Sequence, residues 1–297
     1  MGIITRNACP VCKATAISLR LRAEDYTVSH QQFEIWECTH CSLRFTQNAP
    51  DELSVGDFYQ SDNYISHTDT QKGIINKLYH FVRKTTLKRK QRLVEQTTGL
   101  QKGVLLDIGA GTGAFVHIMK QAGWSTTGLE PDAGTRKRAA DLYGLNLQDA
   151  SSLFQLSAAT FDAITMWHVL EHVHELHAYI EQIKLLLKEK GKALIAVPNY
   201  TSYDAGVYQQ YWAAYDVPRH LYHFTPAAIK NLLNQHGLQL VGIRPMWFDS
   251  FYISMLSEQY KNGRNNLAKA LWNGTLSNVK AVFNKERCSS VIYLIGK

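Results

Sequence analysis

Three glycines at alternate positions follow a short apolar run, and this arrangement restricts the fold of the chain more than any other feature of its sequence. Residues 104–106 have the composition of a central parallel strand, and Gly109, Gly111 and Gly113 follow it. Apolar residues then recur at helical spacing until Gly123. Glycine lets a backbone approach a ligand closely, and the N–H groups at a helix start face negative groups. The sequence therefore predicts a nucleotide-cofactor loop between a strand and a helix.

The second predicted strand, residues 124–129, ends on an acid, Glu130. An acid in that place can accept both ribose hydroxyls of an adenosine-containing ligand. Glycine stands at positions one, three and five of the loop, whereas the dinucleotide fingerprint has glycine at one, three and six. A nicotinamide-dependent enzyme is the main alternative at this point.

From about residue 100 onward, the chain resembles the class I methyltransferases that use S-adenosyl-L-methionine (SAM). Their first motif reads like residues 107–113, and their second strand ends in an acid like Glu130. The resemblance implies a doubly wound, Rossmann-like α/β fold with seven mostly parallel strands, the last of them antiparallel. It also implies that SAM contacts Asp107, Gly109, Ala110, Gly111, Thr112, Gly113, Glu130, Pro131, Asp149, Ala150, Trp167 and His168.

The rest of this region keeps the alternation of strands and helices that such a sheet requires. We expect strands over residues 145–147, 161–167, 193–197, 238–243 and 291–295. We expect helices over residues 132–143, closed by Gly144, and from residue 176 to Gly191. A further helix begins with Thr225 as N-cap and Pro226 in its first turn, and it ends at Gly237.

Cysteine spacing predicts a metal site near the N-terminus. Four of the five cysteines form two C-x-x-C pairs, Cys9 with Cys12 and Cys38 with Cys41. Two such pairs can supply four thiolates to one tetrahedral zinc ion, which stabilises a module too small for its own core. We therefore expect a zinc-ribbon-like module with structural zinc over residues 1–48. His30 or His40 could replace a ligand, and disulfides are the rival in an oxidising compartment. Cys288 is expected to be a buried apolar residue.

Residues 49–100 are expected to form a helical linker, and residues 101–297 the SAM domain. Seven cations and no acid occur between residues 77 and 92, and they equal the formal net charge of +7. They are Lys77, Arg83, Lys84, Lys88, Arg89, Lys90 and Arg92. Such a segment could contact a phosphorylated substrate, a membrane surface or RNA, but a solvated helix face is the interpretation that we favour. No apolar run is long enough to span a membrane and no signal peptide is evident, so a cytoplasmic protein is expected.

A polar cluster follows the fourth expected strand, at the edge of the sheet where ligands bind. If the chain becomes helical there, His168, Glu171 and His172 lie on one face and could act as a base or bind a metal. The stretch resembles small-molecule O-methyltransferases of the ubiquinone-biosynthesis type, which have a second acid in place of His168. That difference makes a divalent metal the less favoured interpretation. Alternatively, Glu171 and His172 satisfy backbone groups of the loop.

Residues 199–224 form an aromatic insert with six tyrosines, which we expect to cover the cofactor cleft and shape an acceptor pocket. Its end resembles a run in zinc-module-bearing SAM methyltransferases associated with bacterial cell-surface and secondary-metabolite pathways. Arg219 could hold an anionic acceptor, and His220 or His223 could take the acceptor proton. Packing roles are the alternative for both histidines. We expect these residues to converge with His168, Glu171 and His172 near the sulfonium of SAM.

Three functions are compatible with these patterns. The favoured one is methyl transfer from SAM to a small or carrier-linked metabolite, at oxygen. An RNA-modifying methyltransferase would suit the zinc module and the basic segment, but residues 167–170 lack the Asn/Asp-Pro-Pro-aromatic run used in adenine methylation. Nucleic acid is therefore not the expected partner. The third is a non-catalytic SAM-binding or zinc scaffold protein.

Overall fold

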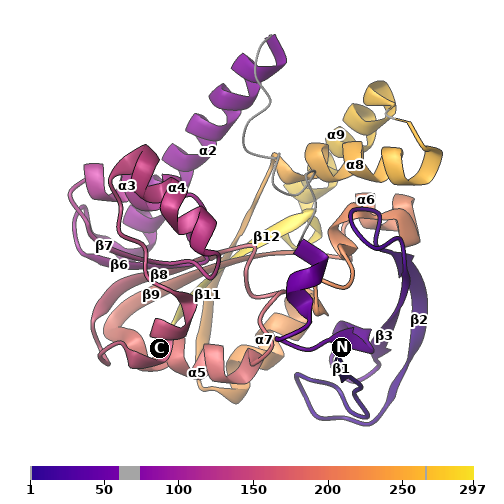
Figure 1. Ribbon diagram of the computed structural model, residues 1–297, viewed down its shortest axis with the longest axis horizontal. Coiled ribbons are helices and arrows are strands. Elements are labelled where there is room, and N and C mark those ends of the chain that lie inside the picture. Colours follow the sequence, from indigo (N-terminus) through magenta and orange to yellow (C-terminus); the bar gives the residue numbers. More distant parts are fainter. Residues whose placement is uncertain (1, 60–73, 265) are drawn as a thin grey trace.

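The computed structural model describes residues 2–59, 74–264 and 266–297, with backbone alone for residues 74–84. Its largest sheet has the strand order β11-β12-β9-β8-β6-β7 and crosses the molecule (Figure 1). The strands are β6 (Val104–Ile108), β7 (Ser125–Leu129), β8 (Phe161–Trp167), β9 (Leu187–Pro198), β11 (Gln239–Pro245) and β12 (Ser290–Gly296). Strands β7, β6, β8 and β9 are parallel, whereas β12 lies antiparallel between β9 and β11. The predicted mostly parallel α/β fold with an antiparallel last strand is confirmed.

Helices cover both faces of this sheet because successive side chains of a strand point to opposite faces. Leu105 packs with Val94 and Phe115 on one face, whereas Leu106 packs with Ile180 and Ile229 on the other. The helices that contribute these residues are α2 (Ile74–Thr98), α3 (Ala114–Gln121), α5 (Leu176–Leu186) and α7 (Pro226–Gln235), and α4 (Ala133–Tyr143) packs beside α3. The expected caps are present, since Gly144 closes α4 with a φ of 62° and the Thr225 side chain accepts a backbone N–H group at the start of α7. Asp132, expected inside α4, is instead its N-cap.

Two expected elements differ from the structure. Residues 145–147 form no strand, because Leu145 and Leu147 pack against Val116 of α3 and Ala139 of α4. Next to them, an isolated parallel bridge joins Gln148 to Leu129 at the end of β7. The helix expected to reach Gly191 ends at Leu186, and β9 begins at once. A Cβ atom on Gly191 would lie 2.8 Å from the carbonyl oxygen of Phe161, so this glycine permits close strand contact rather than ending a helix.

The aromatic insert and the segment before the last strand fold together as short helices. The insert contains α6 (Tyr203–Tyr208), the short 3₁₀ helices η4 (Gln209–Tyr211) and η5 (Ala213–Tyr215), and strand β10 (Tyr222–His223). The segment between β11 and β12 contains α8 (Asp249–Asn262), α9 (Leu267–Phe283) and η6 (Lys285–Arg287), and α8 and α9 lie above α6 in Figure 1. The sequence did not lead us to expect α8 or α9.

The N-terminal region is a small sheet that takes one strand from the insert. Its order is β10-β4-β3-β2, with β2 (Ile17–Glu24), β3 (Gln32–Cys38) and β4 (Arg44–Gln47). Strands β1 (Ile3–Ile4) and β5 (Ala49–Pro50) pair separately, and η1 (Val55–Tyr59) and, later in the chain, η3 (Ala150–Gln155) are short turns. The region therefore shares a sheet with the insert. In the described part of the chain, no helix has the length and apolar character of a bilayer-crossing segment.

Candidate active site

The glycine loop leaves β6 at the carboxyl edge of the large sheet. Gly109, Gly111 and Gly113 all have positive φ angles, of 71°, 54° and 77°. A Cβ atom on Gly109 would lie 2.3 Å from a methyl carbon of Val169, whereas one on Gly111 would meet nothing within 4 Å. The loop is therefore packed against the turn after β8 at one glycine and open at the next, as a cofactor loop requires.

Glu130 lies beside this loop, at the tip of β7. Its carboxylate accepts the backbone N–H groups of Gly111 (2.9 Å) and Asp132 (3.1 Å), and burial raises its pKa. The structure thus places Glu130 where the sequence predicts a ribose contact. Pro131, Asp149 and Ala150 lie next to it, where Arg136 donates to the Pro131 carbonyl and pairs with Asp149 at 2.9 Å.

Asp107 and Trp167 lie at the carboxyl ends of the neighbouring strands β6 and β8, on which helix α2 packs. The Asp107 carboxylate accepts from Thr165 Oγ1 at 2.6 Å, and burial raises its pKa to about 7. Lys90 of α2 lies over the Trp167 ring, with Nζ 4.3 Å from the ring centroid, and burial lowers the lysine pKa. Helix α2 therefore brings a cation to the cofactor edge, which the sequence analysis did not assign.

His168 is held as a cation rather than as a base. Residues 168–172 form a turn and not the conditional helix, because His168 has a φ of 59°. Its Nε2 lies 2.9 Å from Asp249 and its Nδ1 3.3 Å from Glu171. Burial opposes its charge, but the two carboxylates outweigh burial and raise the pKa of His168 to about 10. Asp249 begins α8, in a stretch without a recognisable motif.

Glu171, His172 and His220 form a compact cluster, in which each residue has a potential ligand atom within 4.8 Å of the others. The backbone joins the two segments, since Leu221 N–H donates to the Glu171 carbonyl at 2.8 Å. His172 Nδ1 lies 3.1 Å from the Arg219 carbonyl and His220 Nδ1 2.9 Å from the Ala214 carbonyl. Burial, together with the nearby His220, lowers the pKa of His172 to about 4. The structure therefore brings these three of the predicted residues together.

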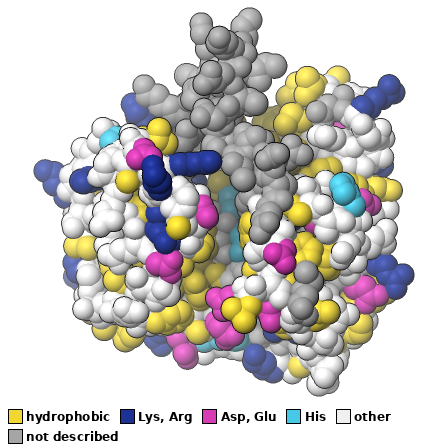
Figure 2. All heavy atoms as spheres, in the orientation of Figure 1, with side chains coloured by type: hydrophobic (Ala, Val, Ile, Leu, Met, Phe, Trp, Pro, Cys, Tyr) yellow, Lys and Arg dark blue, Asp and Glu magenta, His cyan; other side chains and the backbone are white. Residues whose placement is uncertain are grey.

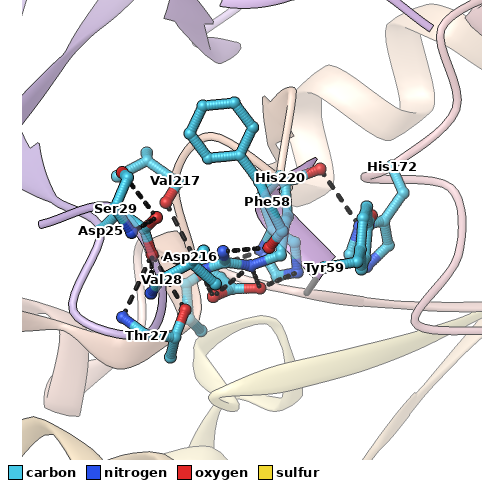
Figure 3. A network of polar contacts seen from close by, with 12 residues as sticks. Asp25, Thr27, Val28, Ser29, Phe58, Tyr59, His172, Asp216, Val217 and His220 are labelled. Carbon is cyan, nitrogen blue, oxygen red and sulfur yellow. Dashed lines mark hydrogen bonds and ion pairs between the residues drawn. The ribbon is translucent and has the colours of Figure 1, made fainter. Parts of the chain in front are cut away.

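Arg219 has a different role from the one expected. Its guanidinium bonds Asp25 at 2.9 Å and Asp216 at 2.7 Å, and it donates to the Phe58 carbonyl at 2.8 Å. Figure 3 shows this network running from the Asp25 loop through Asp216 to His172. Only 1% of the arginine side chain is exposed, so it joins the N-terminal sheet region to the cluster and does not face an anionic acceptor.

Burial alone would raise the pKa of Asp25, but its bonds to Arg219 and to the backbone of Ser29 lower it well below the usual value. Asp25 was not among the predicted site residues, because it follows β2 in a turn with no catalytic motif.

His223 lies apart from the cluster and points toward the N-terminal sheet. Its Nε2 is 3.2 Å from Thr46 Oγ1, and its ring meets the Tyr215 ring edge to face. Burial holds its pKa well below the ordinary value. The packing alternative therefore describes His223 better than a role as proton acceptor.

The aromatic insert forms a core rather than a cover. Tyr208, Trp212 and Tyr215 are almost fully buried between the N-terminal sheet and α8. Tyr211 instead borders an open groove of about 400 Å³ with Tyr26, and no residue of the predicted site lines that groove. Figure 2 shows a separate hollow between the side of α3 and α4 and the side of α6, with histidine side chains inside it.

The four cysteines Cys9, Cys12, Cys38 and Cys41 form a cluster with ligand atoms within 4.8 Å of one another. Both C-x-x-C pairs turn alike: the residue after each pair, Lys13 or Ser42, has a φ of 61° and donates its N–H to the first cysteine of the pair. A hydrogen bond from Cys41 lowers the pKa of Cys9 to about 5. His30 faces Glu24 instead, and Cys288 is buried as expected.

The basic segment contributes to packing where it is described. Arg89 lies over the Phe248 ring, 5.3 Å from its centroid, and Lys90 lies over Trp167. The side chains of Lys77, Arg83 and Lys84 lie outside the described residues.

Known proteins share this fold. The family model described as a methyltransferase domain matches residues 78–243. An uncharacterized methyltransferase of Alkaliphilus oremlandii is 29% identical over 144 residues, which cover 48% of this chain and 63% of that protein. The ubiquinone biosynthesis O-methyltransferase of Maricaulis maris is 28% identical over 149 residues, covering 46% of this chain and 59% of that protein. The chain thus spans about three fifths of the length of these relatives.

A solved structure agrees with the fold over nearly the whole chain. The 1,6-didemethyltoxoflavin-N1-methyltransferase of Burkholderia thailandensis, with bound 1,6-didemethyltoxoflavin and S-adenosylhomocysteine, superposes with a TM-score of 0.50 at 16% identity. The superposition covers 93% of this chain and 99% of that one. Because the family model matches more than half of the chain and the strand order is that of a class I methyltransferase sheet, the chain belongs to the methyltransferase domain family and has its class I fold.

Proposed function

We propose that the enzyme transfers the methyl group of SAM to a hydroxyl oxygen of a small or carrier-linked metabolite. The observation that carries this proposal is the position of the Glu171–His172–His220 cluster. It follows β8 at the sheet edge where the glycine loop follows β6, and Val169 of the same turn packs on Gly109. An acceptor beside the cluster would therefore lie close to the methyl group.

SAM would lie along the edge formed by the glycine loop, with its ribose on Glu130. The remaining predicted contacts, Asp107, Ala110, Thr112, Pro131, Asp149, Ala150, Trp167 and His168, belong to the loops and strand ends of the same edge. The sulfonium is a good leaving group, so the enzyme mainly holds the acceptor oxygen in line with the methyl carbon. The oxygen bonds to carbon as the S–CH₃ bond breaks, its electrons stay on sulfur, and S-adenosylhomocysteine leaves.

We assign loss of the hydroxyl proton to the cluster and not to His168, which is already protonated at neutral pH. His220 directs Nδ1 at the Ala214 carbonyl, so we assign its proton to Nδ1 and a lone pair to Nε2, whereas His172 Nδ1 lies 3.1 Å from the Arg219 carbonyl and 3.0 Å from the Tyr59 hydroxyl. In the described part of the basic segment, Arg89 and Lys90 lie over rings of the same chain while Lys88 and Arg92 are exposed, so the segment by itself does not favour RNA over a solvated helix face.

We also propose that the cysteine cluster binds structural zinc. Four sulfurs close a tetrahedral shell, and two of the pairs, Cys9 with Cys41 and Cys12 with Cys38, are 3.5 Å apart, which is about the ligand spacing of such a shell. A closed shell leaves no position for a substrate, so the ion would stabilise the turns of the N-terminal sheet region.

The test uses SAM labelled in its methyl group, with fractions of a bacterial metabolite extract and total bacterial RNA offered as separate acceptors. We expect label in a small-molecule product, with mass spectrometry placing the methyl group on oxygen. His220→Asn should lower turnover about 100-fold with little change in SAM affinity, as expected for a group used mainly in the transition state. His30→Asn, far along the chain and exposed, is the control. Label only in RNA, or on nitrogen or carbon, would contradict the proposal.

A further inference from the structure

The Glu171–His172–His220 cluster has the ligand set of a divalent metal site. Two imidazoles and one carboxylate are the donors that proteins offer to first-row divalent cations such as Mn²⁺, Fe²⁺, Co²⁺ and Zn²⁺. The three donors come from two separate segments, the turn after β8 and the end of the insert. We propose that this cluster binds one divalent transition-metal cation, separately from the four cysteines.

The carboxylate is the first observation that points to a ligand. The Glu171 side chain is completely buried, and its Oε2 has no hydrogen-bond partner among the described residues. Its other oxygen, Oε1, bonds His168. A buried carboxylate oxygen without a partner is costly, and a bound cation would remove that cost.

The orientation of the imidazoles is a second, independent observation. Metal-binding histidines usually donate their other ring N–H to a backbone carbonyl or a carboxylate, which fixes the tautomer and aims the lone pair. His220 Nδ1 lies 2.9 Å from the Ala214 carbonyl, and His172 Nδ1 lies 3.1 Å from the Arg219 carbonyl, with the Tyr59 hydroxyl 3.0 Å away on the same nitrogen. Their rings cross at 81° with centroids 4.5 Å apart, and each offers a ring nitrogen within 4.8 Å of the other and of the Glu171 carboxylate.

The distances allow a common ion after small movements. With bonds of about 2.1 Å, two ligand atoms of one ion lie at most about 4.2 Å apart. The three donor atoms already lie within 4.8 Å of one another. Asp216 is the nearest competing carboxylate, 3.9 Å from His220 Nε2, but it is bonded to Arg219.

The inference deepens the proposed function, and rests on it only for what the cation does. A cation here would polarise an acceptor hydroxyl and lower its pKa. The two histidines would then hold the cation instead of accepting the proton themselves, and the proton would pass to solvent water. Binding of the cation does not depend on the identity of the acceptor.

The test titrates Mn²⁺ into full-length protein that carries one equivalent of zinc per chain, which the four thiolates take in preference to nitrogen and oxygen donors. Electron paramagnetic resonance and calorimetry follow the binding. Mn²⁺ prefers oxygen and nitrogen donors, so it does not compete for the thiolates. We expect one Mn²⁺ per chain, with affinity at least tenfold weaker in Glu171→Gln and in His220→Asn. The asparagine amide can keep the donor to the Ala214 carbonyl while removing Nε2. Asp141→Asn and His30→Asn remove an exposed carboxylate and an exposed imidazole as matched controls.

SAM affinity and the melting temperature, measured on each sample, show whether a variant is folded. If the wild type binds no Mn²⁺, or if both variants bind it as tightly as the wild type, the site does not exist. SAM binding and methyl transfer without Mn²⁺ binding would overturn this inference and leave the proposed function standing. The reverse result would overturn the proposed function alone.

Discussion

Glu130 has two neighbours that determine what its replacement would do. Its carboxylate already accepts the N–H groups of Gly111 and Asp132, so it orders the glycine loop before SAM arrives. Glu130→Ala should weaken SAM binding by about 2 kcal/mol, or roughly 30-fold in Kd, through the loss of hydrogen bonds to a charged group. Calorimetry measures this loss, with Asp141→Asn as control. Tight NAD binding without SAM binding would refute the assignment.

Asp25 is one residue whose charge links stability to pH. Its carboxyl has a lowered pKa in the folded protein, so its contribution is present above the unfolded pKa of about 3.9 and is lost as the pH falls below that value. Asp25→Asn should lower the free energy of unfolding by about 3 kcal/mol at pH 7, because the buried Arg219 loses the fully buried one of its two carboxylate partners.

Urea unfolding at pH 7, 5 and 3 tests this expectation. The difference between wild type and Asp25→Asn should shrink as the pH falls. Asp141→Asn, which removes an exposed ion pair with Lys137, should change stability little at any of these pH values. A difference that grows toward pH 3 would show that the sign of the linkage is wrong.

At the scale of elements, the sequence predicted those strands and helix ends that depend on residues close together in the chain. Strand β8 and the caps of α4 and α7 agree with the expectation, because alternation, Gly144 and Pro226 act within a few residues. The turn after β8 was less predictable, since the φ of 59° at His168 depends on Asp249, which is distant in sequence. Likewise, the pairing that makes β10 a strand lies in residues 44–45, not in the insert.

The same limit applies to the candidate site. Composition and position brought Glu171, His172 and His220 to attention, and the structure places them together. Arg219 looked available for an acceptor because its partner Asp25 carries no local signal. His223 looked equivalent to His220, but a two-residue strand turns its side chain to Thr46. Contacts between distant segments decided each of these cases.

The strand order of the small N-terminal sheet indicates which strands would lose structure if zinc were lost. Cys38→Ser should remove protection from amide exchange in β3 and β4 and also in β10, because β10 pairs only with β4 in that sheet. SAM affinity should change little, since the glycine loop belongs to the other sheet. Hydrogen exchange with mass spectrometry measures the effect. Unchanged protection of residues 222–223 would show that the two regions are independent.

At the scale of the whole molecule, the N-terminal region and the methyltransferase domain share one continuous core. Cys9, Leu43 and Phe45 pack in the same cluster as Leu170, Tyr222 and Phe224. Deleting residues 1–48 should therefore expose a large apolar face and an unpaired strand, and the product should aggregate. Size-exclusion chromatography would show this. A monomeric product that binds SAM normally would contradict it.

The strand shared between the two regions also affects how the protein is made. Thr46 meets His223, 177 positions later in the chain. At about 5–20 residues per second, a ribosome needs roughly 10–35 s to cover that distance. During that time the four cysteines have already been synthesised, while the backbone hydrogen-bonding groups at the edge of β4 have no β10 to pair with. A nascent chain of this enzyme would therefore depend on early metal capture, or on a chaperone, to keep that edge from pairing with another chain.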